Sequence, residues 1–411
     1  MTAALARHAA RRGLRVRVFK TGPDFIDPMI LARASGHAVY QLDLWMGGAL
    51  HCRRLLSRAA AEADLILIEG AMGLYDGQPS SADLAHAFGV PLAIVVDAGA
   101  MAQTFGAVAL GLSQYRPELA VHGVLANRVA GAAHGRMLAE SLEGRALAPR
   151  FLGFLPQDGA LGIADRHLGL VQAAEIADLD ARLDRAADAI GARVSLEDLP
   201  RVAFPAAPAE EELPTALAGV RVAVARDAAF SFLYPANLDL LRALGASLHF
   251  FSPLAEAQLP AADAVYLPGG YPELHAARLA ANRRLLEALR AHVEAGRPML
   301  AECGGMMLLF ERLTDLEGRP HAMAGLLAGE TILQPRLQGL SLQSVEFEQG
   351  ELRGHTFHHS RLHTTEPAAL QGRTAGGAAG EAVFRRGRLT ATYIHFYWPS
   401  SLAAAASLFL P

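Results

Sequence analysis

A cysteine in a glycine-rich turn is the residue with the clearest chemical potential. The run Ala301-Glu302-Cys303-Gly304-Gly305 follows apolar Pro298-Met299-Leu300 and precedes Met306-Met307-Leu308-Leu309-Phe310, which has the composition of a helix. A strand, a sharp turn and a helix together form a nucleophile elbow, which exposes one side chain at the end of a sheet. A helix N-terminus would lower the pKa of the Cys303 thiol and favour the thiolate. Because free cysteines are often buried, a structural role for Cys303 stays open at this point.

Two further segments carry groups that would complement such a nucleophile. Thr392-Tyr393-Ile394-His395 ends an apolar strand with a histidine, which is the natural general base for an upstream cysteine. A lone histidine in this position is more often a core residue. Leu267-Pro268-Gly269-Gly270-Tyr271 joins a predicted strand to a predicted helix, and its glycines leave backbone N–H groups accessible to an oxyanion. A simple strand-to-helix turn is the alternative reading of these glycines.

Taken in order, these three segments resemble a class I glutamine amidotransferase domain, in the variant found in cobyrinate and cobyrate synthases. The resemblance implies a flavodoxin-like α/β fold in which Cys303 attacks the glutamine carboxamide, forms a γ-glutamyl thioester and releases ammonia. His395 would act first as base and then as acid. Glutamine and oxyanion binding are assigned by the same resemblance to three glycines, Gly269, Gly270 and Gly304. The usual glutamate two residues after the histidine is Tyr397 here, so no third triad member is expected.

Two more segments narrow the resemblance to the cobyrinic/hydrogenobyrinic acid a,c-diamide synthase family. One runs from Arg226 to Leu238, and the other is Arg353-Gly354-His355-Thr356-Phe357-His358-His359-Ser360. The three histidines of the second segment could suggest a metal site. The acidic partners of such a site are absent from the segment, so we expect a structural or interdomain role.

The first half resembles the dethiobiotin-synthetase-like ATPase domain of the same family, with a P-loop-NTPase-like parallel sheet. The segments that carry this resemblance are Phe19-Lys20-Thr21-Gly22-Pro23-Asp24-Phe25-Ile26-Asp27-Pro28 and Ile68-Glu69-Gly70-Ala71-Met72-Gly73-Leu74-Tyr75-Asp76-Gly77. By resemblance, Lys20 neutralises phosphate charge, Glu69 binds Mg²⁺, and Asn127 with Arg128 binds the nucleotide base. Three residues are assigned by the same resemblance to the acceptor: Asp24, Phe25 and Asp76. Each assignment has an alternative: Lys20 could be a surface lysine, and Glu69 could cap the following turn. Asp24 and Asp76 could be turn residues.

The Gly-rich turn ending in Lys-Thr-Thr that this family carries before its first helix does not occur in this sequence. Met1-Thr2-Ala3-Ala4-Leu5 aligns with that helix just after the turn. One hypothesis is that the start site is mis-assigned, which an in-frame upstream reading of the DNA would test. The alternative is a true truncation with weak or absent ATPase activity. In either case, a sheet without its first strand is expected to expose apolar surface and unpaired backbone groups.

The alternation of short apolar strands with helical segments predicts an α/β fold with two domains. We expect an amidoligase domain over residues 1–198, a proline- and glutamate-rich linker over 199–218, and an amidotransferase domain over 219–411. The Gly/Ala-rich stretch Gln371–Gly380 is predicted to be a surface loop.

Composition limits the partners and the compartment. With 411 residues, 52% hydrophobic and 19% charged residues and a net charge of −4, the chain gives no reason to expect a nucleic-acid partner. No apolar run is long enough to span a membrane, and two cysteines suggest no disulfide framework. A cytoplasmic protein, and by resemblance a homodimer, is expected.

The resemblance as a whole implies an ATP- and glutamine-dependent ligase with Mg²⁺ as cofactor. It would amidate the a- and c-carboxylates of hydrogenobyrinic or cobyrinic acid in cobalamin biosynthesis. The high alanine and arginine content suggests a GC-rich genome and slightly favours the metal-free acceptor. Another corrinoid or tetrapyrrole amidotransferase, such as cobyric acid synthase, is the alternative within this class. A remnant with at most glutaminase activity is the alternative outside it.

Overall fold

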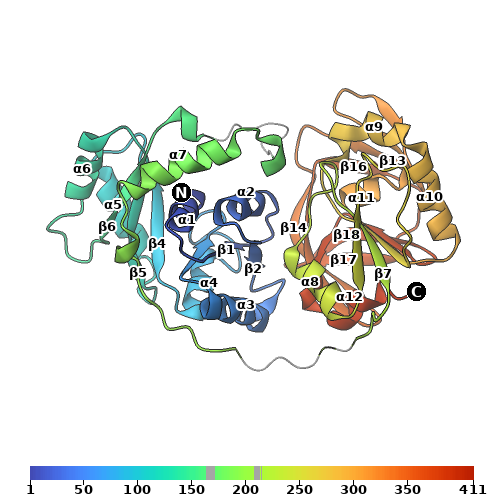
Figure 1. The fold of residues 1–411 in the computed structure, drawn as a ribbon, viewed down its shortest axis with the longest axis horizontal. Helices are drawn as coiled ribbons and strands as arrows, with labels where there is room; N and C mark the ends of the chain where they lie inside the picture. Colours follow the sequence, from blue (N-terminus) through green and yellow to red (C-terminus); the bar gives the residue numbers. More distant parts are fainter. Residues whose placement is uncertain (163–171, 208–212, 214) are drawn as a thin grey trace. The chain divides into compact units, whose positions relative to one another are not determined.

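A computed structural model describes residues 1–162, 172–207, 213 and 215–411, and the chain divides into two compact units (Figure 1). The first unit comprises Met1–Leu44 and Gly48–Ala209, and the second comprises Trp45–Gly47 and Glu210–Pro411. Part of the predicted linker lies outside the described residues. Each unit is an α/β structure, as the alternating pattern predicts.

The first unit contains two three-stranded parallel sheets. Their strand orders are β2-β1-β3 and β4-β5-β6. The strands are β1 (Val16–Thr21), β2 (Tyr40–Leu42), β3 (Leu65–Glu69), β4 (Leu92–Asp97), β5 (Val121–Val129) and β6 (Phe151–Pro156). The helices are α1 (Thr2–Arg11), α2 (Ile26–Ser35), α3 (Gly48–Glu62), α4 (Ser81–Phe88), α5 (Thr104–Gln114), α6 (Ala132–Glu140) and α7 (Leu179–Gly191).

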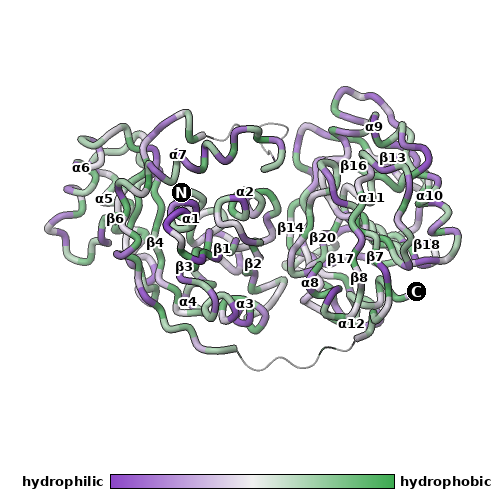
Figure 2. Tube along the Cα trace, viewed as in Figure 1, coloured by the Kyte–Doolittle hydropathy of each residue, from purple (hydrophilic) through white to green (hydrophobic). Residues whose placement is uncertain are grey.

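The strands β3 and β4 are edge strands with incompletely covered apolar residues. Every residue of β3 is only partly buried, although its sequence is Leu-Ile-Leu-Ile-Glu. In β4, buried Ile94 and Val96 alternate with exposed positions, and Val95 is 47% exposed. The apolar run of β4 can be followed in Figure 2. Within the described residues the two strands do not pair with each other.

The second unit is built on one ten-stranded sheet, in the order β20-β15-β14-β17-β18-β19-β10-β9-β7-β8. Its strands β8, β7, β9, β10 and β19 run parallel, and the remainder are antiparallel. A smaller four-stranded sheet, β12-β11-β13-β16, lies beside the one-turn helix that follows Cys303 in the chain. Buried apolar residues form two large clusters in this unit.

The elements of this unit have the following bounds. The strands of the large sheet are β7 (Arg221–Ala225), β8 (Ser247–Phe251), β9 (Ala264–Leu267), β10 (Met299–Glu302), β14 (Gly339–Phe347), β15 (Gly350–His358), β17 (Leu370–Thr374), β18 (Ala379–Arg386), β19 (Leu389–Thr392) and β20 (His395–Tyr397). Those of the small sheet are β11 (Phe310–Thr314), β12 (Pro320–Ala322), β13 (Leu327–Leu333) and β16 (Ser360–His363). The helices are α8 (Pro235–Ala243), α9 (Ala276–Ala281), α10 (Arg283–Glu294), α11 (Gly304–Met307) and α12 (Leu402–Ser407).

The prediction of a surface loop over Gln371–Gly380 is wrong. This stretch contains β17 and the start of β18, which pair antiparallel. The small residues are needed for packing rather than for a loop. A Cβ added at Gly372 or Gly380 would lie 2.9 or 2.1 Å from Oε1 of Gln343, so a larger residue at either position would displace that side chain.

The helix expected after Cys303 is shorter than predicted. It ends at Met307, and Phe310 already begins β11. The carbonyl of Leu309 accepts the N–H groups of Leu326 and Leu327, so it bonds to a neighbouring segment instead of continuing a helix. No helix of the described chain combines the length and apolarity required to cross a membrane.

Candidate active site

Cys303 occupies a strained turn between β10 and α11. Its φ of +46° and ψ of −108° lie in a region that residues other than glycine rarely adopt. The turn is held because the Cys303 N–H donates to the carbonyl of Thr392 at 2.7 Å. A Cβ at Gly305 would lie 2.1 Å from the carbonyl oxygen of Leu267, so the turn also requires a glycine there. This geometry is the nucleophile elbow that the sequence predicts.

Gly269 brings the predicted nucleophile and the predicted base together. A Cβ built on this glycine would lie 2.2 Å from Cε1 of His395 and 3.3 Å from Cβ of Cys303. Both side chains therefore contact the same glycine, although His395 begins β20 and Cys303 follows β10. Both are almost fully buried.

The predicted oxyanion donors lie beside this pair. A Cβ on Gly304 would be 3.1 Å from the backbone nitrogen of Gly270, so the two glycines are in contact. The N–H of Gly270 donates no backbone hydrogen bond within the described residues, and the N–H of Gly304 bonds to the Cys303 thiol itself. Two backbone N–H groups this close to a cysteine can stabilise the oxyanion of a tetrahedral intermediate.

Glu302 was not singled out from the sequence, yet its carboxylate links the nucleophile strand to the strand of the base. It is 1% exposed. The hydroxyl of Tyr266 donates to its Oε2 at 2.7 Å, and the N–H of Phe396 donates to its Oε1 at 3.2 Å. Burial raises the pKa of Glu302 to about 8, although the hydrogen bonds from Tyr266 and Phe396 oppose this. The sequence did contain a signal for this role, because Glu302 is a charged residue at the end of the apolar strand Met299–Glu302.

The resting protonation state differs from the sequence expectation for Cys303. Burial raises the pKa of the Cys303 thiol, and the nearby carboxylate of Glu273 adds to this effect. The predicted lowering by a helix N-terminus is wrong, because α11 has a single turn and the thiol is buried. Burial lowers the pKa of His395. The resting pair is therefore a neutral thiol and a neutral imidazole.

The segment Arg353–Ser360 lies beside this pair, since His355 is the register partner of His395. His358 stacks on Tyr393, with ring centroids 3.7 Å apart, and its Nε2 lies 3.1 Å from Oε1 of Glu381. The thiol of Cys303 donates to the carbonyl of Phe357 at 3.9 Å. The segment thus lies against the site, and the structural or interdomain role expected of its histidines stays a prediction.

In the first unit, Lys20 lies at the centre of three carboxylates. Its Nζ is 2.7 Å from Asp27, 3.1 Å from Glu69 and 3.7 Å from Asp24. Lys20 and Glu69 are register partners on β1 and β3, which places both side chains at the carboxyl ends of adjacent parallel strands. Although burial opposes the shift, Glu69 and Asp27 raise the pKa of Lys20. Lys20 is buried, so the surface-lysine alternative does not apply.

The residues predicted to contact the acceptor lie in two turns. Burial, and then the charge of Asp27, raises the pKa of Asp24 to about 6, and its Oδ1 accepts the N–H of Ile26. Phe25 is buried at the start of α2. Asp76 accepts the N–H of Gly73 at 3.0 Å, which is a turn-stabilising bond.

Asn127 and Arg128 lie near the carboxyl end of β5. Asn127 is the register partner of Asp97 on β4, and the Arg128 guanidinium pairs with Asp97 at 3.3 Å. Arg128 has a φ of +58°, which is unusual for a residue other than glycine. Both charged side chains are more than half exposed and so accessible to a ligand.

Comparison with known proteins matches each half of the chain to a family. Residues 221–402 match the CobB/CobQ-like glutamine amidotransferase domain. Residues 1–170 match the CobQ/CobB/MinD/ParA nucleotide binding domain.

Relatives match the whole chain. A hydrogenobyrinate a,c-diamide synthase of Stutzerimonas stutzeri is 59% identical over 100% of this chain and 95% of its own length. The enzyme of the same name from Pseudomonas aeruginosa is also 59% identical, over 100% of this chain and 94% of its own. A cobyrinate a,c-diamide synthase of Herminiimonas arsenicoxydans is 53% identical, over 100% and 93%. The chain belongs to the a,c-diamide synthase family.

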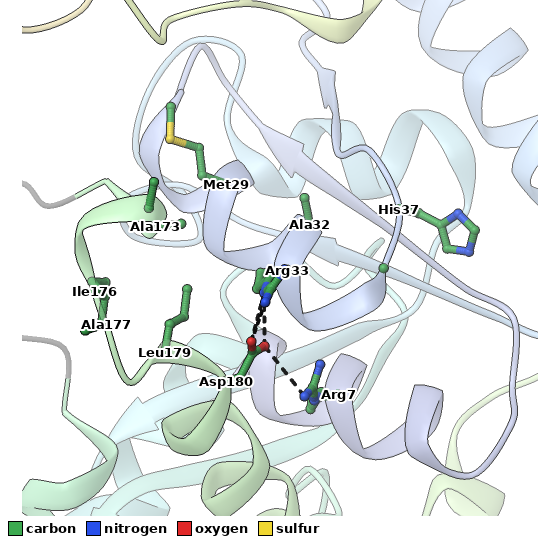
Figure 3. A pocket seen from close by; sticks show the side chains of 12 residues that line it. Arg7, Met29, Ala32, Arg33, His37, Ala173, Ile176, Ala177, Leu179 and Asp180 are labelled. Atoms are coloured by element: carbon green, nitrogen blue, oxygen red, sulfur yellow. Dashed lines mark hydrogen bonds and ion pairs between the residues drawn. The ribbon is translucent and has the colours of Figure 1, made fainter. Parts of the chain in front are cut away.

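A separate pocket of the first unit lies between α1, α2 and α7 (Figure 3). Its volume is about 1130 Å³, and its lining includes Met29, Ile176 and Leu179. The two arginines of its wall, Arg7 and Arg33, both pair with Asp180. None of the predicted site residues lines it, so the pocket is distinct from both candidate sites.

Proposed function

We propose that this chain uses ATP and glutamine to convert the a- and c-acetate side chains of hydrogenobyrinic acid to amides. The observation that carries the proposal is the shared contact of Cys303 and His395 with Gly269, beside the backbone N–H groups of Gly270 and Gly304. The names of relatives that are 59% identical over the full chain support the acceptor. Cobyrinic acid is the second acceptor to test, because it appears in the name of the 53% identical relative.

The glutaminase step begins from the neutral pair. As Sγ of Cys303 attacks the glutamine carboxamide carbon, its proton passes to His395, and the N–H groups of Gly270 and Gly304 bind the oxyanion. The imidazolium then gives the proton to the leaving ammonia, and a γ-glutamyl thioester remains on Cys303. Water deprotonated by His395 hydrolyses this thioester to glutamate and the free thiol. The low proton affinity of His395 favours return of the proton at each stage.

The synthetase step belongs to the first unit. An acetate carboxylate of the acceptor attacks the γ-phosphorus of ATP and forms an acyl phosphate and ADP. Ammonia then adds to the acyl carbon and phosphate leaves, which gives the amide. Lys20 would interact with the transferred phosphoryl group, and Asp24, Phe25 and Asp76 would contact the acceptor.

Mg²⁺ fits the donor set around Lys20. Carboxylate oxygens are the protein ligands that Mg²⁺ prefers, and Glu69 offers one at the end of β3. Within the described residues no three histidine, cysteine or acidic side chains form a metal site by themselves, so phosphate oxygens of the nucleotide would complete the coordination. When bound, the ion would neutralise charge on the phosphates. Asn127 and Arg128 would contact the nucleotide base.

We further propose the division into an amidoligase domain of residues 1–198, a linker of 199–218 and an amidotransferase domain of 219–411. The active form would be a cytoplasmic homodimer that binds no nucleic acid. Sedimentation of the purified protein tests the dimer.

The decisive experiment incubates the purified protein with ATP, Mg²⁺, glutamine and hydrogenobyrinic acid. We expect ADP, glutamate and a product with two amides in place of two carboxylates, detected by mass spectrometry. Cobyrinic acid in a parallel reaction compares the acceptors. Release of glutamate without ADP or amide would contradict the proposal and leave only a glutaminase.

A further inference from the structure

The histidine base lacks the partner that class I glutaminases place two residues after it. Tyr397 stands at that position, is buried, and packs edge-on against Tyr234 with ring centroids 5.3 Å apart. A general base needs a fixed ring orientation, because small misplacements of a catalytic group cost large factors in rate. Another contact must therefore hold the imidazole of His395.

His355 provides such a contact. The His355 and His395 rings are nearly parallel, with an interplanar angle of 20° and centroids 5.0 Å apart. The two residues are register partners on the antiparallel strands β15 and β20, so their side chains lie on the same face of the sheet. The close approach of the strands depends on Gly354, where a Cβ would lie 2.1 Å from the carbonyl oxygen of His395.

The ring of His355 is itself fixed. Its Nδ1 is 3.0 Å from the hydroxyl of Tyr234, and the residue is 5% exposed. Burial lowers the pKa of His355 to about 3, so it presents a neutral ring to His395 rather than a like charge. Gly269 also confines the imidazole, because its backbone leaves no room for a Cβ next to Cε1 of His395.

We propose that His355 is a positioning residue that holds the plane of the His395 imidazole beside Cys303, in place of the missing glutamate. The contact between the two histidines is set by strand register, and the hydroxyl of Tyr234 keeps His355 in its orientation. This inference rests on the proposed glutaminase step.

The test compares His355→Ala with His355→Phe in steady-state glutamine hydrolysis by the full chain. His355→Ala removes the stacked ring, so we expect kcat to fall roughly 100-fold while KM changes by less than about twofold. His355→Phe retains a planar ring, so we expect kcat to recover to within about tenfold of the unchanged protein. His292→Ala is the matched control, because His292 is also a buried histidine of this unit but contacts the carbonyl of Pro298. It should lower thermal stability and leave kcat unchanged.

The pH profile separates positioning from general stability. Removal of the His355 ring admits water, which should shift the acid limb of kcat towards the ordinary histidine pKa in His355→Ala and not in His355→Phe. The inference is overturned if His355→Phe is as slow as His355→Ala, or if the loss of kcat in His292→Ala equals that in His355→Ala.

A labelling assay keeps this inference separate from the proposed function. A chloroketone analogue of glutamine alkylates a catalytic cysteine, and the labelled Cys303 peptide is quantified by mass spectrometry. Slower labelling in His355→Ala without any amidation of corrin acids would sustain the inference and contradict the proposed function. Amidation by the unchanged protein, with equal labelling rates in both proteins, would overturn the inference alone.

Discussion

The two units organise their candidate sites in different ways. In the second unit, the candidate site is built on one continuous sheet: Gly269 and Cys303 each follow a strand, and His395 begins one. The side chains of Cys303 and His395 both contact Gly269. In the first unit, Lys20 and Glu69 lie on β1 and β3, whereas Asn127 and Arg128 lie on β5 of a separate sheet.

The difference teaches how a site acquires its precision. Where all members belong to one sheet, hydrogen-bonded register fixes their spacing, as between His355 and His395. Where members lie on two sheets, their spacing depends on helix packing across edge strands such as β3 and β4. We expect variants of the second unit to slow glutamine hydrolysis alone. Variants of the first unit should slow every reaction that needs ATP, whichever nitrogen donor is used.

The largest effect should follow Cys303→Ser. Loss of the nucleophile should lower glutamine-driven amidation by roughly 10³-fold or more, while amidation driven by ammonium salts persists, because ammonia then needs no release. ADP formation with each nitrogen donor measures both activities. The matched control is Cys52→Ser, a buried cysteine of the first unit, which should retain glutamine-driven activity. If Cys303→Ser lowered glutamine-driven and ammonium-driven amidation equally, the two units would not carry separate reactions and the prediction would be wrong.

Glu69→Gln should show the complementary pattern. The change removes a charge that pairs with Lys20 and would bind Mg²⁺, so amidation with either donor should fall roughly 10²- to 10³-fold. Glutamine hydrolysis alone should remain. Glu62→Gln is the control, since Glu62 is an exposed acid that pairs with Arg17. Unchanged ammonium-driven amidation in Glu69→Gln would contradict the role proposed for this carboxylate.

Gly269→Ala tests how closely the second site is packed. The added Cβ would lie 2.2 Å from Cε1 of His395, so the imidazole must move and glutamine hydrolysis should fall roughly 10²-fold. At Gly376 a Cβ would meet nothing closer than 3.9 Å, so Gly376→Ala should have no effect. Comparable rates in both variants would show that the contact with Gly269 is unimportant.

The last prediction concerns the pH dependence of stability at Glu302, which affects folding rather than the rate of the reaction. Its pKa is about 8 in the folded chain and near 4.5 when unfolded, so the folded state retains a proton that the unfolded state loses. The contribution of Glu302 to stability is therefore largest below pH 4.5 and falls as pH rises towards 8, by up to about 1.4 kcal/mol per pH unit. Glu302→Gln should remove this slope. Urea unfolding at several pH values compares the two proteins, and parallel curves would contradict the prediction.

Many elements of the fold could be predicted from local sequence patterns alone. The strand predicted before Pro268 is β9, which ends at Leu267, and the glycines around Cys303 do mark an elbow. Such features depend on residues that are close in the chain, so the sequence contains the information directly.

Features that depend on distant segments could not be predicted. The bond between Glu302 and Phe396 exists only because β10 and β20 approach in space. The hairpin at Gln371–Gly380 resembles a loop until Gln343 is seen to exclude larger side chains. The raised pKa of Cys303 follows from its burial in the assembled sheet. Each case reflects tertiary packing overriding a local pattern.

The neutral, buried thiol of Cys303 has a consequence for redox chemistry. Peroxides and electrophiles react with exposed thiolates, and their attack on a protonated, enclosed sulfur is slow. Without glutamine, the S–H group donates to the carbonyl of Phe357 and is almost entirely shielded from solvent. The nucleophile should therefore survive oxidant exposure between turnovers and become vulnerable only while a substrate draws its proton to His395.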